Sequence, residues 1–370
     1  MRRKREDADV DSTVMSLDAL QELTNSFSKE LGRGSFGAVY EGEYPDGRKI
    51  AVKMLHAAYG IRAEKFQDEL KIMTKLRHRN IVRLVGYCHH TQQVPIMHEG
   101  KLVVANKISM ALCLEHMPNG SLHELISGGR DKYDWQTCYG IITGICQGLN
   151  YLHNELKPPI FHLDLKPANV LLDDKMIPRI ADFGISRILG EDEHTRVTKS
   201  VLGTLGYSPP EFMDHRIISN KFDIFSLGVV IIKMMAGPDG HSESTEMSSD
   251  EFTKLVQEYW TNEILEPGHQ RKAHSEQVKA CIEFGLRCVK KDRRERPTIL
   301  DIVGILKETE ANHTDAARKE WSSISKTMQL QDRPQENDLS HTVGGKRSVS
   351  HASESSSPRK VARNIDSKMV

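Results

Sequence analysis

Apolar residues follow two different spacings along the chain. Between residues 31 and 56 they form short β-like runs interrupted by glycine, and the Asp46-Gly47 dipeptide between two of these runs predicts a hairpin turn. Beyond residue 120 they recur every three or four residues, which is typical of helices that bury one face. We therefore expect an α+β fold with a small β-rich lobe, a larger helical lobe, and a ligand-binding cleft between them.

Individual helices and strands follow from the same spacings. Phe66, Leu70 and Met73 mark one apolar face of a helix over residues 63–76, and Ser121 with Glu124 forms a capping-box pattern at the start of another. Further helices are expected over residues 135–153, 220–236, 275–289 and 298–307, and strands over residues 49–53, 81–88 and 110–115. The polar stretch between the last two strands, residues 89–108, is predicted to be a loop.

These elements divide the chain into three parts. Residues 1–25 form a charged lead that ends in a short helix, and residues 26–307 form the folded domain, with the β-rich lobe over about 26–116 and the helical lobe over about 117–307. In residues 308–370 the apolar periodicity fades and serine and basic residues accumulate, so this tail is expected to be disordered.

Composition narrows the class of protein. The 370-residue chain has as many basic as acidic residues, so its charge gives no reason to expect nucleic acid as a partner. Its six scattered cysteines, without a C-x-x-C pair, indicate buried thiols in a reducing compartment. No apolar run approaches the roughly 20 residues of a transmembrane segment, and the basic start lacks the apolar stretch of a signal peptide. We expect a cytoplasmic protein; the alternatives are peripheral attachment at the plasma membrane, or the cytoplasmic part of a longer membrane receptor.

A glycine-rich run suggests a phosphate-binding loop. Gly32, Gly34 and Gly37, with Ser35 and Val39 among them, match the pattern G-x-G-x-x-G-x-V. Glycines let backbone N–H groups approach phosphate oxygens without obstruction by a Cβ atom. The same three glycines also open dinucleotide-binding folds, but there they lead into a helix, whereas here they lead into a hairpin. Taken alone, the run also fits a glycine-rich hairpin without a ligand.

Lys53 and Glu69 are a second candidate pair. A lysine at the end of a strand is usually a solvated edge charge. The alternative is a cation that binds phosphates and is held by a carboxylate from the next helix. Glu69 suits that role, because an unpaired carboxylate beside the apolar face of its helix would be costly.

The largest number of candidate catalytic residues lies between His162 and Asn169, and this stretch is followed by Asp182-Phe183-Gly184. Asp164 would orient the hydroxyl that accepts a phosphoryl group, and Lys166 would stabilise charge on that group. Asn169 and Asp182 offer the hard oxygen ligands that Mg²⁺ prefers, with Mn²⁺ as an alternative. Each motif alone has a structural explanation, but their order and spacing together favour phosphoryl transfer.

With these motifs in place, the chain resembles the eukaryotic protein kinases over residues 26–307. The stretches at residues 76–88, 117–122 and 203–207 look most like those of plant receptor-like kinases. Without an ectodomain or membrane span in this sequence, the nearest description is a receptor-like cytoplasmic kinase. The resemblance implies transfer of the γ-phosphate of ATP to serine or threonine hydroxyls of protein substrates. It also implies a place in plant receptor-linked signalling, with an upstream membrane receptor as a partner; the family association includes immunity.

The resemblance implies further residue roles. The adenine slot would be formed by Leu31, Val39, Ala51 and Leu171. Glu115 and Met117 would belong to the hinge, with Leu114 as the gatekeeper. Asp223 would hold the backbone of the catalytic loop, Arg296 would pair with Glu211, and Met73, Leu84, His162 and Phe183 would form an apolar spine.

Leu163 departs from the family pattern, which commonly has Arg between the His and the Asp. An Arg there grips a phosphate on the activation segment, residues 182–211, and leucine cannot do so. We therefore expect activity that depends little on phosphorylation at Thr195, Thr198 or Ser200. The alternative to an active kinase is a catalytically silent scaffold, which Leu163, Pro209 and the insert at residues 89–108 motivate.

Overall fold

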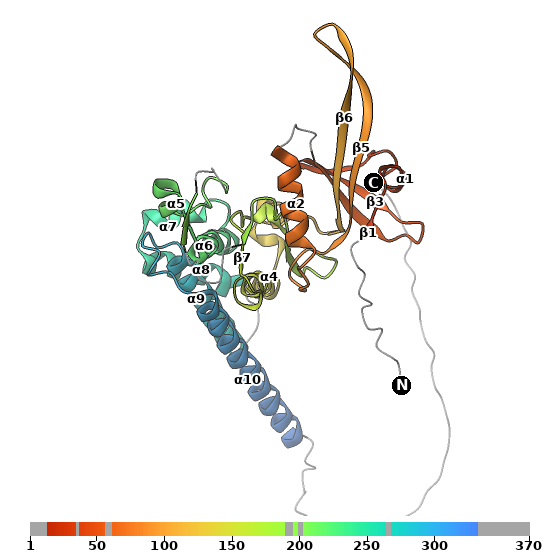
Figure 1. Cartoon of the computed structure of the whole chain (residues 1–370). Coiled ribbons are helices and arrows are strands. Elements are labelled where there is room, and N and C mark those ends of the chain that lie inside the picture. The colour runs from red at the N-terminus through yellow and green to blue at the C-terminus, as the bar shows by residue number, and fades with distance from the viewer. Residues whose placement is uncertain are drawn as a thin grey trace, which may run out of the picture. The chain divides into compact units, whose positions relative to one another are not determined.

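The computed structural model describes residues 13–34, 37–55, 61–188, 195–198, 203–263 and 268–331 (Figure 1). The chain divides into two units, Met1–Ser323 and Ile324–Val370. The first contains a β-sheet with two helices and then a helical region, which confirms the expected α+β class. Of the second, the structure describes only the end of the last helix.

Six strands form one sheet in the order β1-β5-β6-β4-β3-β2, antiparallel except for β1 beside β5. Their bounds are β1 Thr13–Val14, β2 Glu30–Gly34, β3 Gly37–Glu43, β4 Lys49–Leu55, β5 Leu84–His98 and β6 Lys101–Glu115. The predicted turn joins β3 to β4, with Gly47 at φ +82°, a conformation that glycine adopts at little cost.

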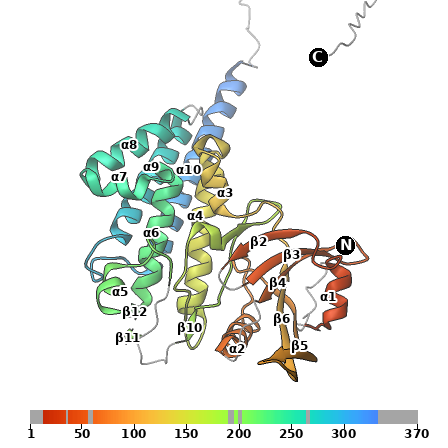
Figure 2. The same cartoon turned by 90° about the horizontal axis from the view of Figure 1, so that it is seen from above.

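Alternation along the strands places a helix on each face of the sheet. Val52, Ala111 and Cys113 pack with Leu20 of α1 (Leu17–Leu23). Leu112, one residue along, packs instead with the cluster that contains Phe66 of α2 (Ile61–Met73). Figures 1 and 2 show the two helices on opposite sides of the sheet. The period of two thus directs one set of side chains to each helix.

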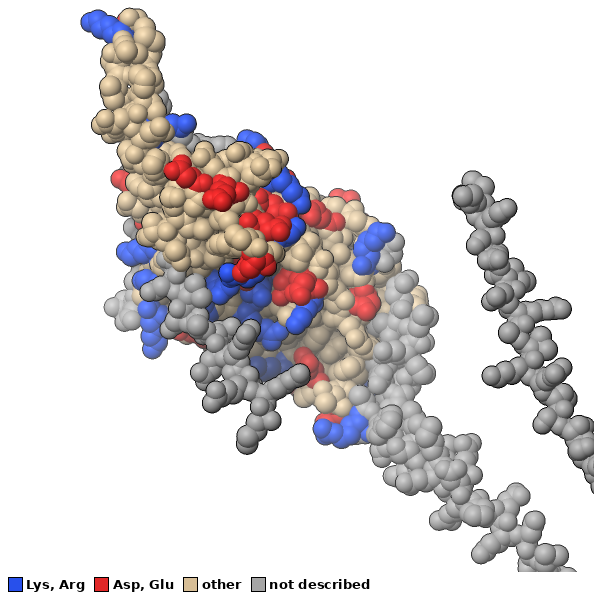
Figure 3. Space-filling view, turned by 90° about the vertical axis from the view of Figure 1, so that its right-hand side faces the viewer, with Lys and Arg blue, Asp and Glu red and all other residues tan. Residues whose placement is uncertain are grey.

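The prediction of a loop over residues 89–108 is wrong. The two strands continue in register from His89↔Met110 to His98↔Lys101 and close over a two-residue turn, in which Glu99 and Gly100 have φ of +49° and +75°. Positive φ at both positions is the backbone of a tight hairpin turn. The hairpin projects beyond the rest of the sheet in Figures 1 and 3. Only the base of the hairpin touches the core, through the buried Met110 and the partly buried Ile108, so the sequence of its outer part does not need the alternation by which half-buried strands are recognised.

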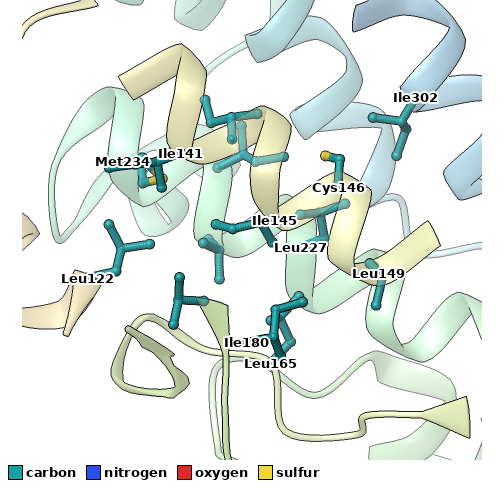
Figure 4. Close-up of a cluster of buried hydrophobic side chains, with 14 of the residues drawn as sticks. Leu122, Ile141, Ile145, Cys146, Leu149, Leu165, Ile180, Leu227, Met234 and Ile302 are labelled. Atoms are coloured by element: carbon teal, nitrogen blue, oxygen red, sulfur yellow. The ribbon is translucent and has the colours of Figure 1, made fainter. Parts of the chain in front are cut away.

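The helical region surrounds one apolar helix. α6 (Asn220–Ala236) is buried on nearly every side, and α4 (Trp135–Asn150) adds an apolar face that includes Ile141, Ile145 and Leu149 (Figure 4). Shorter strands carry the catalytic stretch and the activation segment: β7 Ile160–Phe161, β8 Val170–Leu172, β9 Pro178–Ile180, β10 Arg187–Ile188, β11 Thr195–Val197 and β12 Ile217–Ser219. The other helices are α3 Leu122–Ser127, α5 Pro210–His215, α7 Gly240–Glu246, α8 Ser249–Glu263, α9 Gly268–Cys288 and α10 Ile299–Gln331, with short helical turns at Arg130–Lys132, Tyr151–Glu155 and Pro167–Asn169.

The structure tests two details of the helices predicted from the sequence. The capping box is present, since the Ser121 hydroxyl accepts from the Glu124 N–H and the Glu124 carboxylate accepts from the Ser121 N–H. The last helix, however, continues far past its predicted end at residue 307, so the expected disorder is wrong as far as Gln331. This stretch is rich in good helix formers, which extend a helix without needing an apolar stripe. The remainder of the predicted tail lies outside the described residues.

All six cysteines are free and buried, in agreement with the thiol prediction. Across the part of the chain that the structure describes, no helix is long and apolar enough to span a bilayer.

Candidate active site

Lys53 joins the sheet to the helical region. It lies on β4, and its Nζ is 2.9 Å from Glu69 Oε1 on α2 and 2.8 Å from Asp182 Oδ1. Burial opposes charge on this ammonium, yet the two facing carboxylates hold the pKa of Lys53 above its ordinary value. The reading of Lys53 as a solvated edge charge is therefore wrong, because its side chain is only 10% exposed and paired twice.

Asp182 follows β9 and has φ +68°, in the left-handed region that non-glycine residues rarely adopt. Burial opposes its ionisation, but the Lys53 ammonium outweighs this and lowers the pKa of Asp182. A Cβ on the neighbouring Gly184 would lie 3.3 Å from Glu69 Oε2, so glycine lets α2 approach closely here. The Asp182 carboxylate is thus held ionised beside a fixed cation.

Asp164 lies at the centre of a hydrogen-bond network. The Thr204 hydroxyl donates to its Oδ1 at 2.6 Å, and Lys166 Nζ and Asn169 Nδ2 donate to its Oδ2 at 2.8 and 3.0 Å. Lys166 also donates to the Thr204 hydroxyl at 2.7 Å. The network ties the catalytic loop to the activation segment through three side chains, and it fixes the Asp164 carboxylate in one orientation.

Asp223 of α6 holds the loop from behind. Its two carboxylate oxygens accept the backbone N–H groups of His162 and Leu163 at 2.8 and 2.7 Å, and Oδ2 also lies 2.8 Å from His153 Nε2. His162 Nδ1 accepts from the Asp164 N–H, so its Nε2 is the ring nitrogen that donates to the Ala181 carbonyl. The buried His162 ring also contacts Phe183 edge to face at 5.1 Å. These contacts fix the His162 ring in the core, where it packs against Phe183 and positions the backbone next to Asp164.

Leu163 is fully buried in an apolar cluster, although it has φ +65°. Its neighbours come from β7, the Asp182 loop, α5, β12 and α6, and they are Phe161, Ile185, Phe212, Ile218 and Phe222. A Cβ on Gly203, at φ +79°, would lie 3.1 Å from the Leu163 carbonyl and 3.2 Å from Phe222. We call this group the Leu163 cluster. It joins the catalytic loop to both ends of the activation segment by apolar contact.

The glycines of the predicted phosphate loop differ from one another. A Cβ on Gly37 would overlap the Met54 carbonyl of β4, so this glycine is required by strand packing. A Cβ on Gly32 or Gly34 would meet nothing within 4 Å, so space is open beside both. Ser35 lies outside the described residues. The open positions are where the backbone can approach a ligand.

Strand register pairs one residue of the expected adenine slot with the expected gatekeeper, and the residues expected around adenine remain partly accessible. Ala51 pairs with Leu114, and Val39 pairs with Lys53. Val39, Ala51, Leu114, Met117 and Leu171 are half-buried, and Leu31 is 43% exposed. Side chains of this kind, neither core nor surface, are typical of the lining of a binding cleft.

Glu115 has a role that the sequence did not indicate. Its carboxylate accepts the Arg83 N–H at 2.7 Å and Arg179 Nη1 at 2.9 Å, and Arg179 also pairs with Asp173. The Glu115 side chain is thus committed to bonding within the protein, and its backbone N–H also donates to the Arg83 carbonyl at 3.1 Å. No motif surrounds Arg179, so sequence spacing alone gave no signal for this contact.

The donor set near Asp182 fits a hard divalent cation. Among the described residues, no group of three or more His, Cys, Asp or Glu side chains gathers into a metal site. A metal here would therefore depend on the amide oxygen of Asn169 with the carboxylate of Asp182. Oxygen ligands of this kind, completed by water and phosphate oxygens, are what Mg²⁺ usually has.

One predicted structural pair is also present. Arg296 and Glu211 form two parallel bonds of 2.7 and 2.8 Å, and Arg296 is 2% exposed. This pair anchors α5 to the segment before α10.

Comparison with known proteins identifies relatives that are all protein kinases. A family model described as a protein kinase domain matches residues 26–305. A G-type lectin S-receptor-like serine/threonine-protein kinase of Arabidopsis thaliana is 36% identical over 319 residues, which are 84% of this chain and 36% of the relative. Cysteine-rich receptor-like protein kinase 10 of Arabidopsis thaliana is 34% identical over 304 residues, 80% of this chain and 43% of that protein. Cysteine-rich receptor-like protein kinase 6 of Oryza sativa subsp. japonica is 36% identical over 302 residues, 79% and 41% of the two chains. The chain spans less than half the length of each.

Proposed function

The chain belongs to the protein kinase family, and we propose that it is an active enzyme that transfers the γ-phosphoryl group of ATP to serine and threonine hydroxyls of protein substrates. The observation that carries this proposal is the double pairing of Lys53 with Glu69 and Asp182. A catalytically silent scaffold has no need to keep a buried ammonium between two carboxylates, an arrangement whose desolvation is costly.

Each part of the site would have a separate task. Backbone N–H groups around Gly32 and Gly34 and the Lys53 ammonium would bind phosphates, while Leu31, Val39, Ala51 and Leu171 would enclose the adenine. Asn169 and Asp182 would hold a divalent metal ion, Mg²⁺ or Mn²⁺, which neutralises phosphate charge when bound.

The hydroxyl substrate would be handled by the Asp164 network. Asp164 would accept the hydrogen bond of the incoming hydroxyl and take its proton as the new oxygen–phosphorus bond forms, while the bond from the γ-phosphorus to the bridging oxygen breaks and ADP leaves. Lys166 lies 2.8 Å from Asp164, where it can stabilise negative charge on the transferring group. Thr204 links both residues to the activation segment, so an ordered segment and a correctly oriented Asp164 go together.

The relatives' names, which describe receptor-like kinases, support a proposal about the cellular setting. We propose a kinase domain over residues 26–307, divided into lobes near residue 116, that acts on the cytoplasmic side of plant membranes with a membrane receptor upstream, either as a separate chain or as part of the same one. Co-precipitation of the tagged chain with receptor ectodomain-containing proteins from plant membranes tests this. A chain recovered wholly in the soluble fraction, without any receptor, would refute it.

The test of activity is transfer of labelled phosphate from ATP to the protein itself and to a general protein substrate. We expect wild type to be active with Mg²⁺, and to be silent after chelation. Lys53→Met should lose activity by about 100-fold or more, because phosphate binding and Asp182 are both disturbed. Lys71→Met, the same change at an exposed position of α2, should retain it. Equal background signal from wild type and Lys53→Met would favour the scaffold.

A further inference from the structure

The hairpin made of residues 89–98 and 101–110, which we call the arm, has no role in the site described above. β4 pairs with β6 only from Ala111 to Glu115, and β1 pairs with β5 only at Gly86 and Tyr87. Within the described residues, the arm is therefore a two-stranded ribbon without a neighbouring strand on either side. Such a ribbon is marginally stable in water unless one of its faces is covered.

Register divides the arm into two faces. The uncharged face carries the cross-strand pairs His89/Met110, Thr91/Ile108, Gln93/Asn106, Pro95/Val104 and Met97/Leu102, and contains no Lys, Arg, Asp or Glu. The lysine face carries His90/Ser109, Gln92/Lys107, Val94/Ala105, Ile96/Val103 and His98/Lys101. In Figure 3 the projecting arm shows little charged colour apart from its end.

Exposed apolar surface gathers at the outer half of the uncharged face. Met97, Leu102 and Val104 are 68%, 71% and 70% exposed, whereas Ile96 and Val103 on the lysine face are 38% and 37% exposed. With Pro95 beside them, the three side chains present on the order of 400 Å² of apolar surface, the size of the largest patch on a typical monomer. We call these four residues the arm patch.

Both edges of the arm are protected against pairing with a further strand, so a partner would bind one of its faces instead. Proline within a sheet is confined to an edge whose N side points to solvent, so Pro95 removes a donor from the outer edge of β5. Lys101 and Lys107 lie on β6, and lysine on an edge strand discourages addition of another strand. Docking by strand addition is therefore disfavoured. A lipid surface is disfavoured as well, because the Glu99 carboxylate lies at the tip and would enter first.

From these observations, we propose that the arm patch binds the same patch of a second copy of this chain. A two-fold axis between the levels of Pro95/Val104 and Met97/Leu102 stacks these four side chains on their counterparts, with the arms antiparallel. No charge is buried, and Gln93 comes to lie beside Glu99 of the copy, where its amide can donate to the carboxylate. The lysine face could not pair in this way, because Lys101 and Lys107 would approach like charges.

The surface area that the two patches would bury indicates how strong the contact can be. Two patches would bury about 800 Å² in total, which is below the roughly 1,200 Å² of stable standard interfaces. We therefore expect a weak, reversible dimer, to be sought in the micromolar range. The inference is independent of phosphoryl transfer and holds equally for an inactive chain.

The test is sedimentation equilibrium of the full chain across the micromolar range, with cross-linking by a short bismaleimide. The native cysteines are buried, so introduced thiols are the reactive ones. Met97→Cys should cross-link between chains, and Ile96→Cys, one residue along on the lysine face, should not. Leu102→Glu, at an exposed position, should raise the dimer dissociation constant more than about tenfold. Lys107→Gln, a charge change on the other face, should not raise it.

A chain that stays monomeric throughout this range would overturn the proposal, as would equal cross-linking at positions 96 and 97. Sedimentation of the Lys53→Met variant separates this outcome from that of the proposed function. Dimerisation should be the same with or without catalytic activity.

Discussion

Leu163 offers the sharpest test of how the activation segment is held. Leu163→Ala removes a side chain that is 0% exposed and touches aromatic and branched residues from five elements. Fully buried Leu→Ala changes cost about 3–5 kcal/mol where the surroundings cannot collapse, and we expect about 3 kcal/mol here. The melting temperature should fall by about 5–10 °C. Leu163→Met, which conserves volume, should cost less than about 1.5 kcal/mol.

The assay is urea unfolding followed by the fluorescence of Trp135 and Trp260, which are buried in the helical region. Activity of Leu163→Ala should fall more than its folded fraction does, because the Leu163 cluster positions the loop that carries Asp164. If the free energy of unfolding stays within about 0.5 kcal/mol of wild type, the cluster does not hold these elements together.

The same residue predicts how the enzyme is controlled. Leucine offers no donors to a phosphate, so alanine at all three of Thr195, Thr198 and Ser200 should leave most activity intact. Thr195 and Thr198 lie in or beside β11, which pairs with β12, and Ser200 lies outside the described residues. A loss as severe as that of Asp164→Ala in the same phosphate-transfer assay would contradict this prediction.

Two further predictions concern buried charge. Arg296→Met should destabilise the protein by about 3–5 kcal/mol because it leaves the Glu211 carboxylate unpaired, and Glu211→Leu in the same chain should recover part of this loss in urea unfolding. Burial opposes ionisation of Asp223, but its contacts with His153, His162 and the Leu163 N–H together outweigh burial and lower the pKa of Asp223. The resulting stability is present above about pH 4 and is lost as pH falls through the folded pKa of Asp223. Asp223→Asn should therefore be less stable at pH 7, and its free energy of unfolding should fall less steeply below about pH 4 than that of wild type. Equal slopes for the two proteins in this acid range would refute the prediction.

Local motifs in the sequence identified several residues that the fold brings together, because phosphoryl transfer requires particular side chains. Lys53 and Asp182 are 129 positions apart, yet they meet at 2.8 Å, and both were identified from local motifs. Each motif is short and its residues have few substitutes, since a phosphate needs cations and a metal needs hard oxygens. The packing partners of Leu163 could not be identified in this way, because many apolar residues can fill a cluster.

The arm was missed for the opposite reason. Strands are recognised when one face is buried, and the outer arm has neither face buried by the rest of the chain. Thr91, Gln92 and Gln93 therefore read as a polar loop, although they form regular strand pairs. The signal that remained was Glu99-Gly100, a weaker turn pattern than Asp-Gly or Asn-Gly. Its positive φ values became visible only in the structure.

Two adjacent residues of the predicted catalytic loop, Leu163 and Asp164, lie in opposite kinds of environment. Asp164 faces three hydrogen-bond donors, while Leu163 enters an apolar cluster, and the positive φ of Leu163 accompanies this divergence. Asp223 binds the N–H groups of His162 and Leu163, so the backbone cannot shift to satisfy one side at the expense of the other. An Arg–phosphate contact weakens with salt and depends on a modification, whereas apolar contacts depend on neither. Because Ile185 and Phe212 belong to this cluster, the described residues at and beside the two ends of the activation segment should stay in place whenever the helical region is folded. We therefore expect control to act elsewhere on the chain.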